Sequence, residues 1–187
     1  MSWQDLLRQN FTSWEKLSNF LELSGEQKEE LLISPHFPLN VPFRLALKMQ
    51  KGSLTDPLFL QFVALKKELE EKEGFLEDPV QDLCFQKNAR LLQKYKSRVL
   101  LISTGACAMN CRFCFRQDYP YESKDKEFNE ELESIAQDAS IDELILSGGD
   151  PLSLSNRVLN GLLERAFAIP HLKRLRFHTR FPIGIPE

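Results

Sequence analysis

Two patterns of hydrophobic positions divide the sequence. Up to about residue 73, apolar residues recur at helical spacing, as Trp14, Leu17 and Leu21 do behind a capping residue at Thr12 or Ser13. From residue 98 onward, short continuous apolar runs alternate with helical patterns. The chain is therefore expected to begin with helices and to continue as an α/β unit.

Further helices are expected in the N-terminal region. One begins at Ser24 and ends near Ser34–Pro35, a second carries Phe43 on its apolar face and stops at Gly52, and a third begins at Thr55–Pro57. The charged run at residues 66–73 is interpreted as a solvated helix face rather than a binding patch.

A stretch without clear periodicity, residues 74–97, follows the helices and is expected to be irregular. Cys84 lies in it and is interpreted as a small apolar core or loop residue rather than a ligand.

The second half predicts strands and helices in alternation. Buried strands are expected at residues 99–102 and 144–146, a third strand at 174–178, and helices at 127–139 and 156–168. Such repeats favour a parallel sheet of βα units. Cys107, Gly148 and His178 each follow the end of a predicted strand, and the C-terminal ends of parallel strands form the edge that carries the chemistry in α/β barrels.

Composition narrows the class of protein. The chain has 187 residues, of which 42% are hydrophobic, which is enough for a packed core. A net charge of −3 argues against a nucleic-acid partner bound through a broad basic surface. No apolar run approaches the ~20 residues that span a bilayer, and the first residues lack the layout of a signal peptide, so no membrane association is expected. Four cysteines, three of them clustered, suit a reducing cytoplasm.

The cluster consists of Cys107, Cys111 and Cys114. Thiolates at such close spacing favour soft metal sites, namely iron–sulfur clusters, zinc or copper(I). Three ligands would leave one iron of a four-iron cluster open for chemistry. Structural zinc is the alternative, but neither Cys84 nor any of the three histidines stands at zinc-finger spacing. A disulfide framework would suit a shorter, secreted chain.

The spacing Cys-x3-Cys-x-aromatic-Cys, with Phe113 before Cys114, resembles that of the radical S-adenosylmethionine (SAM) enzymes. Over residues 98–116, 147–152 and 169–180, the sequence is similar to the lysine 2,3-aminomutase family, and within it to the bacterial branch that makes β-lysine for the modification of elongation factor P. The resemblance implies a radical SAM (β/α) barrel.

The expected organisation follows from that resemblance. Residues 1–73 would form a helical N-terminal region, residues 74–97 a connecting segment, and residues 98–187 the first half of the barrel. Because the family's barrel is longer, the α/β chain is expected to be truncated: a fragment, a disrupted product or one piece of a split protein.

The resemblance also assigns the first group of site residues. Cys107, Cys111 and Cys114 would hold a 4Fe–4S cluster, and SAM would chelate its open iron. Phe113 is similar to the aromatic residue near the adenine in this superfamily; a core phenylalanine is the alternative.

The loop after the second barrel strand would contact SAM. Gly148, Gly149 and Asp150 match the loop that binds its amino group; glycines let a backbone approach a ligand closely, although a simple turn is the commoner explanation of such a sequence. Arg180 could pair with the SAM carboxylate or with a phosphate; a salt bridge at the barrel rim is its alternative.

A third group would bind pyridoxal 5′-phosphate (PLP) and substrate. Lys94, Tyr95 and Arg98 match the residues that grip the PLP phosphate in the family, with Lys94 in place of an arginine, which loses the bidentate fork. Arg116 matches an arginine that meets the substrate carboxylate. The sequence at 117–118 departs from the more basic run usual there, which leaves the substrate open.

The implied function is isomerisation of L-lysine to β-lysine with a low-potential electron donor. The lysine that binds PLP covalently falls in the half of the barrel expected to be missing, so the isolated chain is not expected to turn over lysine. Three alternatives remain: an aminomutase for glutamate or another amino acid, a SAM-cleaving enzyme without PLP, and a non-catalytic zinc-binding or interaction module.

Overall fold

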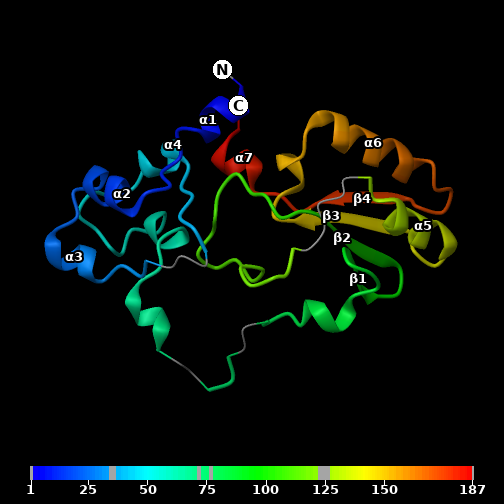
Figure 1. Cartoon of the computed structure of the whole chain (residues 1–187), viewed down its shortest axis with the longest axis horizontal. Helices are drawn as coiled ribbons and strands as arrows, with labels where there is room; N and C mark the ends of the chain where they lie inside the picture. Colours follow the sequence, from blue (N-terminus) through cyan, green and yellow to red (C-terminus); the bar gives the residue numbers. More distant parts are fainter. Residues whose placement is uncertain (1, 34–36, 71–72, 76–77, 122–126, 187) are drawn as a thin grey trace. The chain divides into compact units, whose positions relative to one another are not determined.

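The computed structural model describes residues 2–33, 37–70, 73–75, 78–121 and 127–186. The chain divides into two compact units, each described by itself (Figure 1). The first contains the residues up to Pro79, Ala108–Gln117 and the residues from Pro182 onward; the second contains Val80–Cys107 and Asp118–Phe181. None of the described helices is long and apolar enough to cross a membrane.

The first unit is built from short helices. They are α1 (Trp3–Leu7), α2 (Trp14–Phe20), α3 (Gly25–Glu29) and α4 (Phe43–Ala46), with the 3-10 helices η1 (Phe59–Gln61) and η2 (Lys66–Leu69). The helical character expected for this region is confirmed, but the elements are shorter than expected: α4 ends well before Gly52, and the start at Thr55 leads only into η1. The expected end near Ser34–Pro35 lies outside the described residues.

Side-chain caps explain where these helices begin. The hydroxyl of Ser13 accepts a hydrogen bond from the N–H of Lys16 at the start of α2. Ser24 and Gln27 form a capping box at the start of α3. Asp56 accepts bonds from two N–H groups ahead of η1. The sequence signals placed the starts of α2 and α3 correctly, whereas the signal at Thr55–Pro57 lies ahead of the short 3-10 helix η1.

The core of the first unit is apolar and includes one residue, Met109, of the loop that carries Cys107, Cys111 and Cys114 (the cysteine loop). Leu21, Val41, Phe59 and Val63 are almost wholly buried. Met109 is 3% exposed and belongs to the same cluster. The charged residues of η2 are exposed, as expected for a solvated face. The short last helix, α7 (Phe181–Gly184), follows at the end of the described chain.

The second unit is a four-stranded sheet with two helices. The strands are β1 (Leu91–Tyr95), β2 (Arg98–Thr104), β3 (Glu143–Gly148) and β4 (Arg174–Phe177), in the order β1-β2-β3-β4. The helices are α5 (Asn129–Gln137) and α6 (Asn156–Phe167), with the 3-10 helices η3 (Asp82–Phe85) and η4 (Pro151–Ser153). Strands β2, β3 and β4 are parallel, which confirms the predicted βα arrangement.

Strand β1 corrects the expectation that residues 74–97 are irregular. It pairs antiparallel with β2 across a two-residue connection, and Leu91 lies opposite Leu101. Only Leu91 and Leu92 are buried in it, and polar residues follow them, so its apolar signal is too short to be distinguished from a loop. Cys84 is exposed on η3 rather than part of a core.

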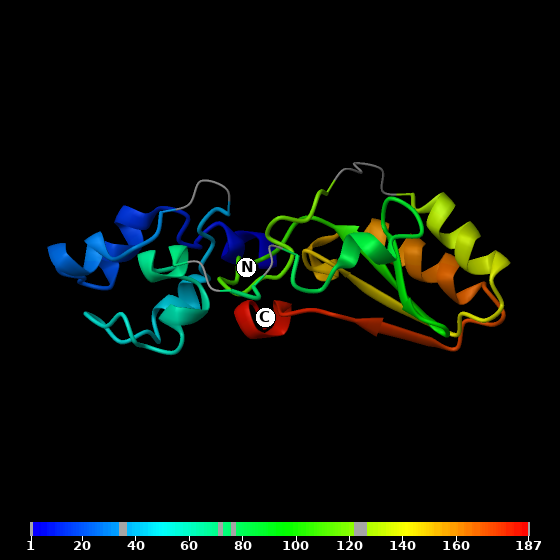
Figure 2. The same cartoon turned by 90° about the horizontal axis from the view of Figure 1, so that it is seen from below.

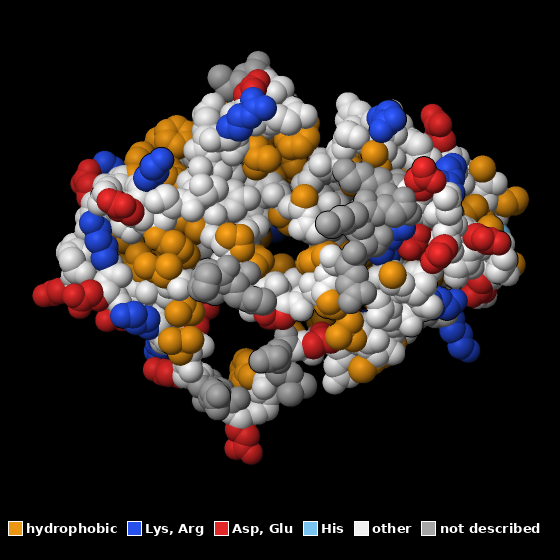
Figure 3. Space-filling view, in the orientation of Figure 1, with side chains coloured by type: hydrophobic (Ala, Val, Ile, Leu, Met, Phe, Trp, Pro, Cys, Tyr) orange, Lys and Arg blue, Asp and Glu red, His pale blue; other side chains and the backbone are white. Residues whose placement is uncertain are grey.

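Both long helices cover the same face of the sheet (Figure 2). Leu101, Leu144 and Leu146 pack in one buried cluster with Ile135 of α5 and Leu162 of α6. Because side chains alternate along a strand, the residues between these leucines point to the opposite face. On the side drawn in Figure 3, Lys and Arg side chains are interspersed with Asp and Glu.

Candidate functional site

The cysteine loop follows β2 and is anchored by its own backbone and polar side chains. The N–H of Asn110 donates to the carbonyl of Asn40 (3.0 Å), and its amide group donates to the carbonyl of Pro38 (2.7 Å). Arg112 donates through its N–H to the carbonyl of Gln61 (2.8 Å), and its side chain pairs with Glu68 (2.7 Å). These bonds fix the part of the loop that carries Cys111 and Cys114 to the first unit.

The three clustered cysteines are half-buried thiols, and none forms a disulfide. Cys107 groups with the second unit, whereas Cys111 and Cys114 group with the first. The N–H of Cys114 donates to the carbonyl of Cys111 (2.9 Å), so these two residues are the ends of a single tight turn. Among the described residues, no set of three or more His, Cys, Asp or Glu side chains is gathered as a metal site.

The chemistry of these donors fits an iron–sulfur cluster. Three thiols are soft ligands of one kind within eight residues, and each keeps part of its surface accessible. Cys84, the remaining cysteine, is exposed on η3.

Two aromatic residues beside the cysteines are exposed. Phe113 has 61% of its surface accessible, so it belongs to neither of the two cores described, and its contact with a ligand stays a prediction. Phe115 is also exposed and lies under the guanidinium of Arg116, 4.7 Å from its ring centroid. Arg116 itself is buried, and its contact with a substrate carboxylate stays a prediction.

The two glycines at the end of β3, Gly148 and Gly149, pack against backbone. Gly148 has a φ of +126°, and a Cβ there would lie 2.3 Å from the carbonyl oxygen of Thr104. A Cβ on Gly149 would lie 2.3 Å from the carbonyl oxygen of Ala106. The N–H of Gly149 donates to Thr104 (2.6 Å), and that of Asp150 donates to Ala106 (2.8 Å). Glycine is therefore required here by the chain that leads into Cys107.

Asp150 joins the ends of β3 and β4. Its carboxylate is 5% exposed and accepts hydrogen bonds from the Thr179 hydroxyl (2.7 and 2.8 Å), the N–H of Arg180 (2.8 Å) and the N–H of Leu152 (3.0 Å). The N–H of His178 also donates to the carbonyl of Leu146 (2.9 Å). Sequence reasoning missed Thr179, whose only signal is its place between His178 and Arg180.

The prediction that these motifs share the C-terminal edge of the parallel strands is thus confirmed within the second unit. The ends of β2, β3 and β4 and the residues that follow them meet at the C-terminal edge of the parallel strands: Gly148 is the last residue of β3, and Cys107 and His178 lie in the connections after β2 and β4. The contacts of these residues with SAM stay predictions.

The predicted phosphate-binding residues lie at the other end of β2. Lys94 pairs with the buried carboxylate of Asp82 (2.8 Å). Tyr95 is exposed, and the guanidinium of Arg98 lies 5.4 Å from its ring centroid. Arg98 also approaches Glu143, a 1% exposed carboxylate that sequence reasoning did not single out. The structure therefore separates this group from the glycine loop by the length of a strand.

Comparison with known proteins shows which families and proteins the chain is similar to. A family model described as a 4Fe-4S single cluster domain matches residues 97–173. The chain is 36% identical over 190 residues to an L-lysine 2,3-aminomutase of Haemophilus influenzae, covering 100% of this chain and 56% of that protein. It is 38% identical over 191 residues to the Escherichia coli protein of the same name, covering 98% of this chain and 55% of that protein. For the Clostridium subterminale protein the identity is 27% over 192 residues, with coverages of 99% and 46%.

The chain spans about half the length of the curated relatives it matches. The similarity runs through both units, since it covers nearly every residue of the chain. The family depends on a 4Fe–4S cluster, SAM and PLP, and the matched cluster domain includes all three clustered cysteines. Over its whole length, the chain is thus similar to roughly half of proteins named L-lysine 2,3-aminomutase.

Proposed function

We propose that the chain serves the isomerisation of L-lysine to β-lysine. The observation that carries this proposal is similarity over the whole chain to proteins named L-lysine 2,3-aminomutase, with the three cysteines inside the matched cluster domain. When bound, the cluster and SAM would supply a carbon-centred radical able to abstract hydrogen from the substrate, and PLP would carry the migrating nitrogen. Cys107, Cys111 and Cys114 would hold the cluster.

The other residues would bind and orient ligands. The fixed connections after β3 and β4 would present backbone groups of Gly148 and Gly149, and the side chain of Arg180, to SAM. Asp150, whose carboxylate already accepts bonds from Thr179 and Arg180, would act by holding these connections in place. Arg116, which is buried beside Phe115, would hold a substrate carboxylate.

The electron donor, the use of the product and the cellular compartment are also part of the proposal. A low-potential electron donor would reduce the cluster, and the β-lysine product would serve the modification of elongation factor P, on the resemblance of residues 98–116 to that branch of the family. A reducing cytoplasm would keep the three thiols available for iron.

The metal content of the purified chain tests the proposal. After anaerobic reconstitution with iron and sulfide, we expect about four irons per chain, as a 4Fe–4S cluster requires. Cys111→Ala should lose most of this iron, because it removes one of three ligands. Cys84→Ala is the matched control and should keep it, because Cys84 is exposed on η3.

A different metal would contradict the proposal. One tightly held zinc per chain, with little iron, would support the zinc-binding module instead. Equal iron in the two variants would show that the clustered thiols are not the ligands.

A further inference from the structure

The spacer between the first two clustered cysteines, residues 108–110, is anchored residue by residue in the helical unit. The side-chain amide of Asn10 donates to the carbonyl of Ala108 (2.8 Å), which lies 98 residues further along the chain. Met109 is buried in the core of that unit. Asn110 donates from its N–H (3.0 Å) and from its side chain (2.7 Å) to two backbone carbonyls. Each residue of the spacer therefore has an anchor of its own.

Asn10 acts as a donor to two acceptors. Its Nδ2 lies 2.8 Å from the carbonyl oxygen of Ala108 and 2.7 Å from Oδ1 of Asn40. A backbone carbonyl only accepts hydrogen bonds, so the atom of Asn10 that faces Ala108 has to be the NH2 group rather than the oxygen. The same NH2 group then requires an oxygen from Asn40. The orientation of both amides therefore follows from the carbonyl of the cysteine loop.

The carbonyl that Asn10 contacts belongs to a buried part of the loop. Ala108 and Met109 are 2% and 3% exposed, so water has little access to this backbone. A buried carbonyl that loses its donor costs free energy, because no solvent molecule replaces the bond. Cys111, the residue after the spacer, packs against the same core. Loss of the Asn10 amide should therefore loosen the segment that leads into Cys111.

An anchored spacer also matters for the binding of a metal. A flexible spacer has to be ordered when its thiols bind, and this ordering costs conformational entropy. Bonds that hold all three spacer residues meet that cost when the chain folds, which leaves the loop preorganised. Asn10 has no thiol, carboxylate or imidazole, so it influences a metal only through the loop that it holds.

We propose that Asn10 is a positioning residue of the metal site, which holds residues 108–110 and thereby Cys111 in the conformation that binds metal. The proposal rests on the proposed function in naming a 4Fe–4S cluster as the bound group. It assigns a role to Asn10 and to its partner Asn40, which both lie outside the cysteine motif.

Alkylation of the metal-free chain tests the anchor without any cofactor. Asn10→Asp keeps the size of the side chain and removes its N–H donors, so the carbonyl of Ala108 loses its partner. We expect iodoacetamide to modify Cys111 at least about threefold faster in this variant. Asn10→Ala, which adds no charge, should act in the same direction. The exposed Cys84 should react at an unchanged rate, and mass spectrometry of the peptides measures both thiols in one sample.

Three further variants separate this anchor from general effects. Asn10→Gln keeps the amide donors, so Cys111 should react more slowly in it than in Asn10→Asp. Asn19→Asp makes the same change on α2 of the same unit, where the oxygen that accepts from Lys28 is retained, and should behave like the unaltered chain. Ile135→Val weakens the core of the second unit and should leave the rate at Cys111 unchanged under conditions where the chain stays folded.

The reconstituted chain gives a second measurement. Iron should pass from Asn10→Asp to a chelator at least about threefold faster than from Asn19→Asp, because a loosened loop opens more often. Ile135→Val should release iron at the rate of the unaltered chain, which a purely structural role of Asn10 would not predict for variants of matched stability in urea.

Three results would overturn the proposal. An unchanged rate at Cys111 in Asn10→Asp and Asn10→Ala would show that the amide does not hold the loop. An equal acceleration in Ile135→Val would show that only overall stability matters. Faster alkylation with unchanged release of iron would show that the anchor does not position the metal site. Failure of the proposed function would instead appear as zinc in the unaltered chain, and the alkylation rates would still decide whether Asn10 holds the loop.

Discussion

At the C-terminal edge of the sheet, single residues determine how closely the connections between strands can approach one another. Gly148 and Gly149 allow the backbone after β3 to reach the carbonyls of Thr104 and Ala106, just before Cys107. The sequence predicted glycines near a ligand, and the structure shows that the residues packed against them are part of the chain itself. This contact could not be foreseen, because it depends on where two distant segments meet.

A pair of glycine substitutions tests this point. Gly149→Ala should lower the free energy of unfolding by about 1–3 kcal/mol, because its Cβ meets backbone that a rotamer change cannot move. Gly161→Ala, in the interior of α6 with nothing within 4 Å of the added Cβ, should raise it by about 0.5–1 kcal/mol. Urea unfolding followed by circular dichroism measures both, and a stabilising Gly149→Ala would contradict the packing described.

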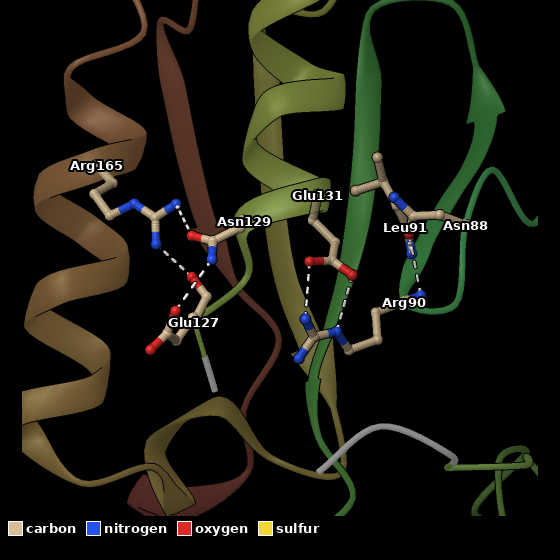
Figure 4. A network of polar contacts seen from close by, with 7 residues as sticks. All are labelled: Asn88, Arg90, Leu91, Glu127, Asn129, Glu131 and Arg165. Carbon is tan, nitrogen blue, oxygen red and sulfur yellow. Dashed lines mark hydrogen bonds and ion pairs between the residues drawn. The ribbon is translucent and has the colours of Figure 1, made fainter. Parts of the chain in front are cut away.

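At the scale of elements, a buried ion pair connects β1 to α5 (Figure 4). Arg90, just before β1, donates from Nε and Nη2 to the two carboxylate oxygens of Glu131 at 2.9 and 2.8 Å. The guanidinium also lies 4.5 Å from the ring centroid of Phe128, which precedes α5. At the same end of α5, Arg165 of α6 donates to Asn129 (2.8 Å). Helix α5 begins at Asn129 rather than at 127 because Phe128 has a left-handed backbone, with a φ of +56°.

Removing one member of this pair should be costly. Arg90→Met leaves Glu131 buried without its cation and should lower the free energy of unfolding by about 3–5 kcal/mol. The double variant Arg90→Met/Glu131→Leu should recover much of that loss, because no buried charge remains. Arg174→Met, at an exposed pair, is the control and should cost about 1 kcal/mol or less. An equal loss in both single variants, measured by urea unfolding, would count against a special role for burial.

Elements with continuous apolar runs or a strong helical pattern were predictable from the sequence, and those stabilised by distant partners were not. The patterns at 99–102, 144–146 and 156–168 correspond to β2, β3 and α6. Strand β1 has two buried leucines only and is stabilised by pairing with β2. The ion pairs of Glu143 with Arg98 on β2 and with Arg176 on β4 depend on strand register, which a single sequence does not reveal.

At the scale of the whole molecule, two separate cores carry different parts of the predicted chemistry. The helical unit buries Met109 and holds the turn between Cys111 and Cys114. The sheet unit brings together the connections that follow three parallel strands. The cysteine motif and the match to a 4Fe-4S cluster domain support the central proposal, that the three cysteines hold a SAM-binding four-iron cluster.

Electron paramagnetic resonance of the reconstituted, reduced chain, with and without SAM, tests that claim most directly. We predict a four-iron signal that changes when SAM is added, because SAM would occupy the iron that the three cysteines leave open. The signal should be missing from Cys111→Ala and present in Cys84→Ala. A four-iron signal that SAM leaves unchanged, or no such signal in a folded chain that holds zinc, would contradict the account.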